Sequence, residues 1–521
     1  MKPCTQFLRT LVLSLIIMLT TGFICRKEFV GKKEARGIWL TRWEYTTLLE
    51  TVDPNLQQAK IIEVMENAAR AKFNFILFQV RGQCDAFYRS QYEPWAKELT
   101  GILGEDPDWD PLAFAIEHAH QRGLELHAWV NTFNCWKGEE PPAACQPPHV
   151  YHAHPEWICA DSNGVPMQLS SHYVTLSPGI PEVREYVHKV SMDIVKNYDI
   201  DGIHFDYIRY PEKANRLGYS HDSISVAHFN SLESNPEHLN WEDWQREQIN
   251  KFVRKFYDEA TALKPMLKVS ASVIGKYDWS EWNGFNVVFQ DARKWMEEGK
   301  MDFIVPMIYW RRGNPDAPFG KIVQEWIEKY NYNRYVFPGM AVYKMNRPEW
   351  PPNEIEAQVN MIRRLNAKGM VFFSYSGLIQ MLKQSTYQSY KYFANMPPMR
   401  WKDSVPPNPP TSLRIEECTP EQVILLWDPP QKSLNGDVAK YYNIYRSTRQ
   451  PIETNSAKNL LAITTHNEPI FIDSQIETET TYYYAVSALD DGNNESIPSN
   501  TILVRVPALA SVFPDSSAIA D

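Results

Sequence analysis

One alternation runs through most of this chain. A short run of β-branched or aromatic residues is followed by a stretch with apolar residues at helical spacing, and the pair recurs eight times between Glu34 and Met399. The predicted strands occupy residues 36–42, 73–81, 124–133, 200–209, 267–275, 301–310, 335–343 and 369–377. Eight strand–helix units predict a closed (β/α)8 barrel with insertions. A doubly wound open sheet is the alternative, but it requires no count of eight.

The fourth predicted strand carries polar residues inside an apolar run. Alternate residues of a barrel strand point outward to the helices and inward to the lumen. Because Ile203 and Phe205 are apolar and belong outside, His204 and Asp206 are predicted to point inward. Asp201 has outward parity at the opposite end of the strand, so we interpret it as a structural residue.

The same parity applies to two neighbouring strands. The residues predicted to point inward there are Gln79, Arg81, Glu125, His127, Trp129 and Asn131. The last inward residues, Arg81, Asn131 and Asp206, open onto the carboxyl-end face, where barrel enzymes place their sites. Asp206 is therefore the leading catalytic candidate. The alternative is an ion pair with Arg209 or Arg81 that only holds the rim together.

Several motifs carry a family resemblance. They include "EARGIWLTR", "FNFILFQVRGQCDAFYRSQYEPWAKELTG", "DPLAFAIEHAHQRGLELHAWVN", "DGIHFDYIRYP" and "GMVFFSYSG". Together and in this order they resemble the family-10 glycosyl-hydrolase-like proteins of bacteria, over about residues 34–399. The resemblance implies a TIM barrel, export and action on a bacterial or host glycan, with peptidoglycan glycan strands as one substrate. Ser177 and Gln245 depart from the usual family pattern.

Glycosidic cleavage ordinarily uses two carboxyl groups that flank the bond. Asp206 is the first, and Asp85 is the predicted partner, with Glu93 and Asp278 as alternatives. An equally open interpretation is that Asp85 caps its loop or pairs with Arg81.

Other residues are predicted to bind the sugar. Arg81, His127, Asn131, His204 and Arg209 are the polar candidates, and Trp129, Tyr207, Tyr309 and Trp310 are the aromatic ones. No cofactor is expected. The rival function is a glycan-binding protein that kept the barrel without turnover. The sequence leaves the sugar, the linkage and the oligomeric state open.

Charge and composition exclude some partners. There are 53 Lys and Arg against 63 Asp and Glu, a formal charge of -10 without a clustered basic face, so nucleic acid is not an expected partner. His149, His152 and His154 lie in a Pro-rich loop without nearby carboxylates and are interpreted as surface groups, so no metal is expected.

The N-terminus predicts export. Lys2 and Arg9 precede the apolar run Leu11–Ile24, which suits a signal peptide over residues 1–25 better than a membrane span. Cys25 follows directly and is a candidate lipid-carrying residue. The predicted location is the periplasm, the outer membrane or the cell surface. Disulfides are then permitted among the cysteines of the body.

The character of the chain changes near Trp401. Residues 400–410 form a predicted Pro-rich linker that separates two domains. Residues 407–506 show short alternating strands at the spacing of a sandwich, and with Trp427 they resemble a fibronectin type III domain. Residues 507–521 form a tail.

Overall fold

The computed structural model describes residues 31–383, 390–465 and 468–509. The predicted signal peptide, Cys25 and most of the tail lie outside the described residues. Within them, no helix has both the length and the apolar character needed to cross a membrane.

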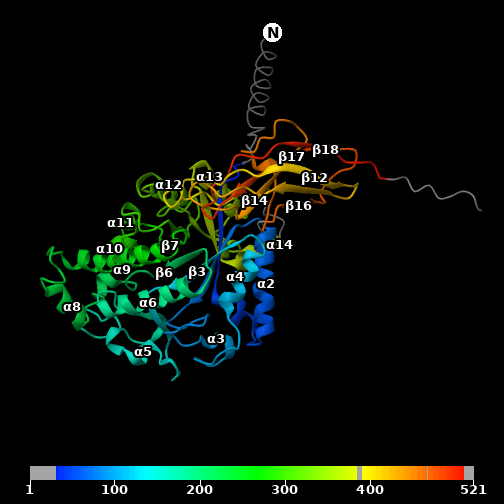
Figure 1. Cartoon of the computed structure of the whole chain (residues 1–521). Helices are drawn as coiled ribbons and strands as arrows, with labels where there is room; N and C mark the ends of the chain where they lie inside the picture. The colour runs from blue at the N-terminus through cyan, green and yellow to red at the C-terminus, as the bar shows by residue number, and fades with distance from the viewer. Residues whose placement is uncertain (1–30, 384–389, 466–467, 510–521) are drawn as a thin grey trace, which may run out of the picture.

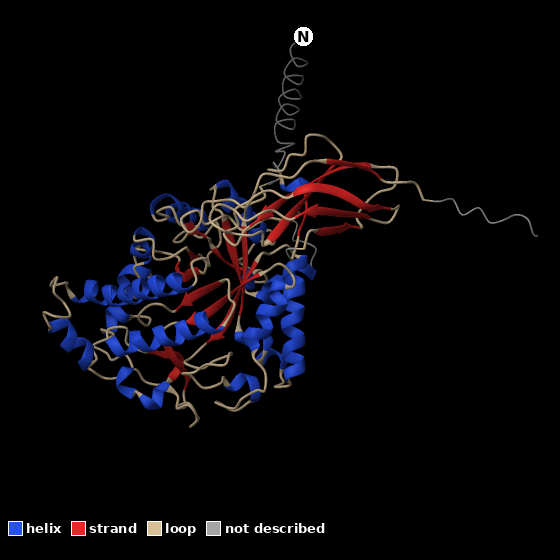
Figure 2. Cartoon of the chain, in the orientation of Figure 1, coloured by secondary structure: helices blue, strands red, loops and turns tan. Residues whose placement is uncertain are grey.

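Eight parallel strand positions form a closed barrel. Figure 2 shows strands of this barrel running between the helices. They are β1 (Ala35–Leu40), β2 (Phe75–Arg81), β3 (Glu125–Asn131), β6 (Gly202–Asp206), β7 (Lys268–Ile274), β8 (Phe303–Met307), β9 (Tyr335–Val336) with β10 (Gly339–Ala341), and β11 (Gly369–Phe373). β11 pairs with β1 and β10 pairs with both β11 and β8, so the sheet has no open edge. The predicted barrel is confirmed, and the open-sheet alternative is wrong.

Helices surround the barrel (Figure 1). The longer ones are α2 (Pro54–Arg70), α4 (Pro111–His120), α6 (Pro181–Asn197), α8 (Ser223–Asn230), α9 (Trp241–Leu263), α11 (Ala292–Glu297), α12 (Phe319–Lys329), α13 (Glu354–Arg364) and α14 (Tyr375–Lys383). Local sequence sets where they begin: Asp53 and Asp110 accept hydrogen bonds from the first free N–H groups of α2 and α4, and each is followed by a proline. Single-turn helices are α3 (Lys97–Thr100), α5 (Val150–Ala153), α7 (Ala214–Leu217) and α10 (Gly284–Val287).

Two apolar layers follow from the alternation along the strands. Ile203 and Phe205 belong to the large core between strands and helices. Phe75, Trp129 and Phe303 belong to a separate core that fills the lumen. The lumen is thus packed by side chains, as in other barrels of this kind.

An antiparallel hairpin lies beyond the carboxyl end of β3. It is formed by β4 (Asn134–Gly138) and β5 (Ser170–Thr175). The backbone N–H of Lys137 donates to Oε1 of Gln83 at 3.2 Å, which ties the hairpin to the loop after β2.

The C-terminal region is an all-β unit with two sheets. One sheet contains β12 (Thr411–Cys418), β13 (Val423–Asp428) and β16 (Ile470–Asp473), and the other contains β15 (Leu460–Ile463), β14 (Tyr441–Ser447), β17 (Thr481–Leu489) and β18 (Ile502–Arg505). Trp427, Tyr442 and Tyr484 lie in the core of this unit. The arrangement is consistent with a sandwich, and the fibronectin type III identity stays a prediction.

The predicted linker does not hold the two parts of the chain away from each other. Nε1 of Trp401 donates to the Asp302 carboxylate at 2.8 Å, and Nζ of Lys402 lies 3.1 Å from the same group. Asp302 directly precedes β8, so the segment after residue 400 lies on the amino end of the barrel. Figure 1 shows the C-terminal strands gathered at that end.

Candidate active site

A cavity of about 290 Å³ lies at the carboxyl end of the barrel. Its walls come from most of the strands and from the β4–β5 hairpin. The lining residues are Trp39, Thr41, Trp43, Gln79, Trp129, Asn131, Lys137, Tyr173, Asp206, Tyr207, Arg209, Ser272, Met307, Tyr309 and Phe373. Two further cavities adjoin it: one of about 550 Å³ shares Lys137, Tyr173, Tyr207 and Arg209, and one of about 220 Å³ shares Met307 and Tyr309.

Asp206 ends β6 and is 8% exposed. Its Oδ1 accepts a hydrogen bond from the Tyr207 N–H at 2.7 Å. Burial raises the pKa of Asp206 to about 6, although that N–H and the charge of Arg209 act in the opposite direction. The ion-pair interpretation is wrong, because no Lys or Arg of the described residues lies within 4 Å of this carboxylate. A pKa of about 6 lies close to neutral pH, which is the range that suits a general acid.

No second carboxylate lines the central cavity within the described part of the chain. Asp161 and Glu212 line the adjoining 550 Å³ cavity. Oδ1 of Asp161 accepts from the N–H groups of Asn163 and Val165, so this side chain stabilises a turn. Glu212 is exposed.

The predicted partner Asp85 does not reach the cavity. It is fully buried, and its carboxylate accepts from Nη1 of Arg42 at 3.2 and 3.3 Å and from the N–H groups of Gly82 and Gln83. The catalytic assignment is wrong, and the loop-capping alternative is correct, with Arg42 in place of Arg81 as the ion-pair partner.

The two alternative partners also lie elsewhere. Glu93 pairs with Arg81 and accepts a hydrogen bond from the Tyr186 hydroxyl at 2.8 Å. Asp278 lines a different cavity, of about 590 Å³. Neither lies in the wall of the Asp206 cavity.

The predicted inward position of Arg81 is wrong. Gln79 pairs with Trp129, but Arg81 pairs with Val130, so one extra residue in β2 reverses the parity of Arg81. Its Nε and Nη2 donate to the Glu93 carboxylate at 2.8 and 2.7 Å, and both side chains are fully buried. Arg81 stabilises the fold on the outer face of the sheet. It does not line the cavity, so its predicted role in sugar binding is wrong.

His127 lies too deep in the barrel to contact a ligand. Its Nε2 is 3.2 Å from the Glu125 carboxylate, and its ring packs 5.3 Å from that of Phe75. The residue does not line the cavity, so its predicted role in binding is wrong.

His204 lies one layer below the cavity. Nε1 of Trp39 lies 3.3 Å from its Nε2, and the Oγ atoms of Ser272 and Ser270 lie 2.8 Å from Nε2 and 2.9 Å from Nδ1. Because an indole N–H only donates, Nε2 accepts and Nδ1 carries the proton. Burial lowers the pKa of His204 well below its usual value, so the ring is neutral. His204 positions Trp39 and Ser272, and its predicted direct contact with the sugar is wrong.

Five predicted binding residues do lie in the cavity wall. They are Trp129, Asn131, Tyr207, Arg209 and Tyr309. Nδ2 of Asn131 donates to the carbonyl of Gly82 at 2.9 Å, which fixes its orientation. Trp310 lies in the adjoining 220 Å³ cavity. Their binding of a sugar stays a prediction.

Sequence reasoning missed other residues of the wall. Trp39 alternates with Ile38 and Leu40, and Ser272 alternates with Ala271 and Val273, so the parity argument extended to their strands would have found both. Lys137 and Tyr173 come from the hairpin, and no periodic signal predicts that it lies over the cavity.

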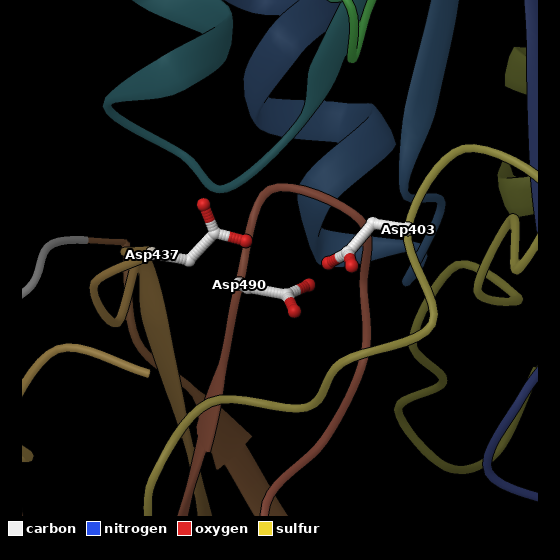
Figure 3. Close-up of side chains that lie close together, drawn as sticks. All are labelled: Asp403, Asp437 and Asp490. Atoms are coloured by element: carbon white, nitrogen blue, oxygen red, sulfur yellow. The ribbon is translucent and has the colours of Figure 1, made fainter. Parts of the chain in front are cut away.

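Two groups of side chains carry atoms that can bind a metal: three histidines after β4 and three aspartates near the sandwich. His149, His152 and His154 each have a separate partner, respectively the carbonyls of Gln83 and Pro142 and the carboxylate of Glu156. The interpretation as surface groups without nearby carboxylates is wrong for His149, which is fully buried, and for His154, which contacts Glu156. Figure 3 shows a different group, Asp403, Asp437 and Asp490, whose carboxylate oxygens lie within 4.8 Å of one another.

This acidic group lies where the linker meets the sandwich, and none of its three residues lines the candidate cavity. Nδ2 of Asn435 donates to Asp403 and Asp437, and Asn494 donates to Asp490. Burial and the neighbouring carboxylates raise the pKa of Asp490 to about 6. Oxygen donors of this kind suit a hard divalent cation, but the asparagines already satisfy several of the oxygens.

A closed (β/α)8 barrel whose carboxyl-end cavity combines a protonatable carboxylate with aromatic faces is an architecture that TIM-barrel glycosidases share. The chain belongs to the glycosyl hydrolase-like 10 family, whose family model matches residues 34–357. The glycosyl hydrolase YngK of Bacillus subtilis is 30% identical over an alignment of 536 positions, which covers 95% of this chain and 98% of that protein. The glycosyl hydrolase DigH of Escherichia coli K12 is 27% identical over 342 residues, 60% of this chain and 74% of that protein. Among solved structures, the glycoside hydrolase domain of PgaB (BpsB) from Bordetella bronchiseptica has a TM-score of 0.46 at 11% identity, covering 68% of this chain and 97% of that one.

Proposed function

We propose that this protein is an exported glycoside hydrolase that cleaves glycosidic bonds of a bacterial or host polysaccharide, with peptidoglycan glycan strands as the first candidate. The family implies a glycan substrate. The observation that carries the proposal is the state of Asp206: a buried carboxyl in the cavity wall, without a cation in ion-pair contact among the described residues, and with a pKa raised to about 6.

Asp206 acts as the general acid. A carboxyl group with a pKa near 6 is partly protonated at neutral pH and donates its proton to the leaving oxygen of the glycosidic bond. Trp129 and Tyr309 line the same cavity and offer aromatic surface to the sugar rings. The bond between the anomeric carbon and the leaving oxygen breaks, the hydroxyl of a water molecule bonds to that carbon, and the remaining proton of the water restores Asp206.

The shape of the face supports a polymeric substrate. The central cavity shares lining residues with two neighbouring cavities, so several hollows lie close together at the carboxyl end of the barrel. A chain of several sugars fits such a group of hollows better than a monosaccharide does.

A second candidate function is glycan binding without turnover. The observation that favours it is the presence of a single carboxylate, Asp206, among the described residues of the central wall. Most glycosidases use two. The two candidates differ in one measurable product, which is the new reducing end.

The test is the release of reducing ends from purified peptidoglycan, with and without its stem peptides, by wild-type protein and by Asp206→Asn. Hydrolysis by the wild type and a loss of at least about a hundredfold in the variant support the hydrolase. Binding to the strands without release of reducing ends supports the alternative.

Export and anchoring are part of the proposal. The apolar run Leu11–Ile24 and the following Cys25 support secretion with a lipid on Cys25. Cys25→Ser is expected to move the protein from the membrane fraction to the soluble fraction. A wild-type protein that is already soluble contradicts the anchor and leaves the catalytic proposal intact.

A further inference from the structure

The cavity wall contains an arginine that forms no ion pair within the described residues. Arg209 is 7% exposed and lines both the central and the 550 Å³ cavity. Its Nε is buried without a hydrogen-bond partner, and Nη1 makes a long bond of 3.4 Å to the carbonyl of Tyr210. Its guanidinium lies 4.9 Å from the centre of the Tyr207 ring, and no carboxylate of the described residues lies within 4 Å. A buried charge is normally paired with an opposite charge. The Arg209 guanidinium has no such partner within 4 Å among the described residues, so an anionic group of a ligand can take that position.

A second cation lies in the same two walls. Lys137 comes from β4, and its Nζ lies 5.6 Å from the centre of the Tyr173 ring. It also has no carboxylate within 4 Å in the described ranges. Two cations from unrelated segments, one after β6 and one on the hairpin, therefore line the space next to Asp206.

The acids of this region do not neutralise the two cations. Asp161 is held by its turn, Asp206 is the reacting group, and Glu212 is exposed and makes no ion pair within the described chain. Lys213 adds a further positive charge to the adjoining cavity. A negative ligand group is favoured in this place, even though the whole chain carries a formal charge of -10.

We propose that the subsite beside Asp206 binds a sugar that carries a carboxylate, with Arg209 and Lys137 as the residues that recognise it. This inference rests on the proposed glycosidase function and specifies its substrate class. A guanidinium donates two parallel hydrogen bonds to a carboxylate, and the flanking aromatic rings suit the sugar that carries it. An ether-linked acid and a uronic acid present the same group, and the experiment separates them.

The bound carboxylate also affects the general acid. Arg209 lowers the pKa of Asp206, so an anion that neutralises Arg209 leaves the effect of burial opposed by the Tyr207 N–H alone. Burial raises the pKa of Tyr173, Tyr207 and Tyr309, the other titratable groups of the wall, and keeps them neutral; Lys137 is the remaining cation. Asp206 is thus expected to keep its proton to a higher pH with an acidic sugar than with a neutral one.

The experiment measures binding to the full chain carrying Asp206→Asn, which prevents turnover. The probes are chitohexaose, which is uncharged, a peptide-free peptidoglycan hexasaccharide, which carries lactyl ether carboxylates, and a hyaluronan hexasaccharide, which carries uronic carboxylates. We expect at least one acidic probe to bind about tenfold more tightly than chitohexaose, and we expect Arg209→Gln and Lys137→Gln each to remove most of that preference. Arg216→Gln, an exposed arginine outside both cavities, is the matched control and should keep it.

The outcomes separate the two proposals. Equal binding of acidic and neutral probes, or no binding of any probe at millimolar concentration, overturns the inference, as does a preference that neither variant reduces. If Arg209→Gln does not fold, the Lys137→Gln variant alone tests the inference, because Lys137 is exposed and its replacement should leave the fold intact. Reducing-end release by the wild type without an acidic preference overturns only this inference, whereas an acidic preference without release overturns only the hydrolase.

Discussion

Nζ of Lys440 lies 3.3 Å from the carboxylate of Asp201, so a lysine of the C-terminal sandwich forms an ion pair with the residue that precedes β6. Oδ2 of Asp201 also accepts the Leu126 N–H at 2.8 Å and lies 2.8 Å from Nε2 of His120. This structural role agrees with the interpretation of Asp201 from its parity. Nearby, Asn493 donates to Glu125 at 3.1 Å. The sandwich thus contacts the amino end of two barrel strands whose carboxyl ends line the candidate site.

The first prediction concerns this contact. Lys440→Met should lower the free energy of unfolding of the barrel by roughly 1–2 kcal/mol, because it leaves a nearly buried Asp201 with fewer partners. Differential scanning calorimetry of the full chain measures the effect. Lys432→Met, at an exposed position of the same domain, is the control. A barrel transition that is unchanged in Lys440→Met but lowered in a chain ended at Met399 would assign the stabilisation to other contacts.

The second prediction concerns Asp206. Its folded pKa of about 6 lies above the ordinary value, so its contribution to stability is present below about pH 4 and is lost as the pH rises through 6. Asp206→Asn has no such loss. The variant should therefore be more stable than the wild type at pH 8, by on the order of 3 kcal/mol, and of similar stability at pH 4. Its turnover should fall at least about a hundredfold.

Unfolding at both pH values, with turnover measured on the same preparations, checks this prediction. A variant that is less stable at pH 8 would point to a lost ion pair. Wild-type turnover by the variant would falsify the catalytic assignment.

The third prediction separates structure from binding at Arg81. Arg81→Met should lower the free energy of unfolding by about 3–5 kcal/mol, because Glu93 is left charged and fully buried. The double variant with Glu93→Met should recover a large part of that loss. For the folded fraction, KM should match the wild type, since Arg81 does not line the cavity. A raised KM at wild-type stability contradicts this assignment.

The fourth prediction concerns a second reacting carboxylate. Both Asp206 and Glu212 raise the pKa of Tyr207, after the larger effect of burial, so both charges lie within electrostatic reach of one hydroxyl group. If a second carboxylate activates water, Glu212→Gln should lower kcat by about a hundredfold with little change in KM. Asp161→Asn, from the same cavity but bound within its turn, should leave kcat within a few-fold of the wild type. Equal effects of the two variants argue against a catalytic Glu212.

The sequence alone determined the barrel and the inward position of Asp206. Both follow from local periodicity: apolar Ile203 and Phe205 must face the helices, so Asp206 faces the lumen wherever the neighbouring strands lie. The same reasoning predicted Trp129 and Asn131 in the cavity wall and applies equally to Trp39 and Ser272.

Only the tertiary structure decided the partners of these residues. One extra residue in β2 moves Arg81 out of the lumen, and a hairpin after β3 places Lys137 in the cavity wall that also contains Arg209. The partner of Asp85 is Arg42, from a different strand–helix unit. Alternation fixes the face on which a side chain lies, because it depends only on adjacent residues of one strand. Ion-pair partners and the pKa of a buried carboxyl depend on register and on burial by distant segments, and no local pattern contains that information.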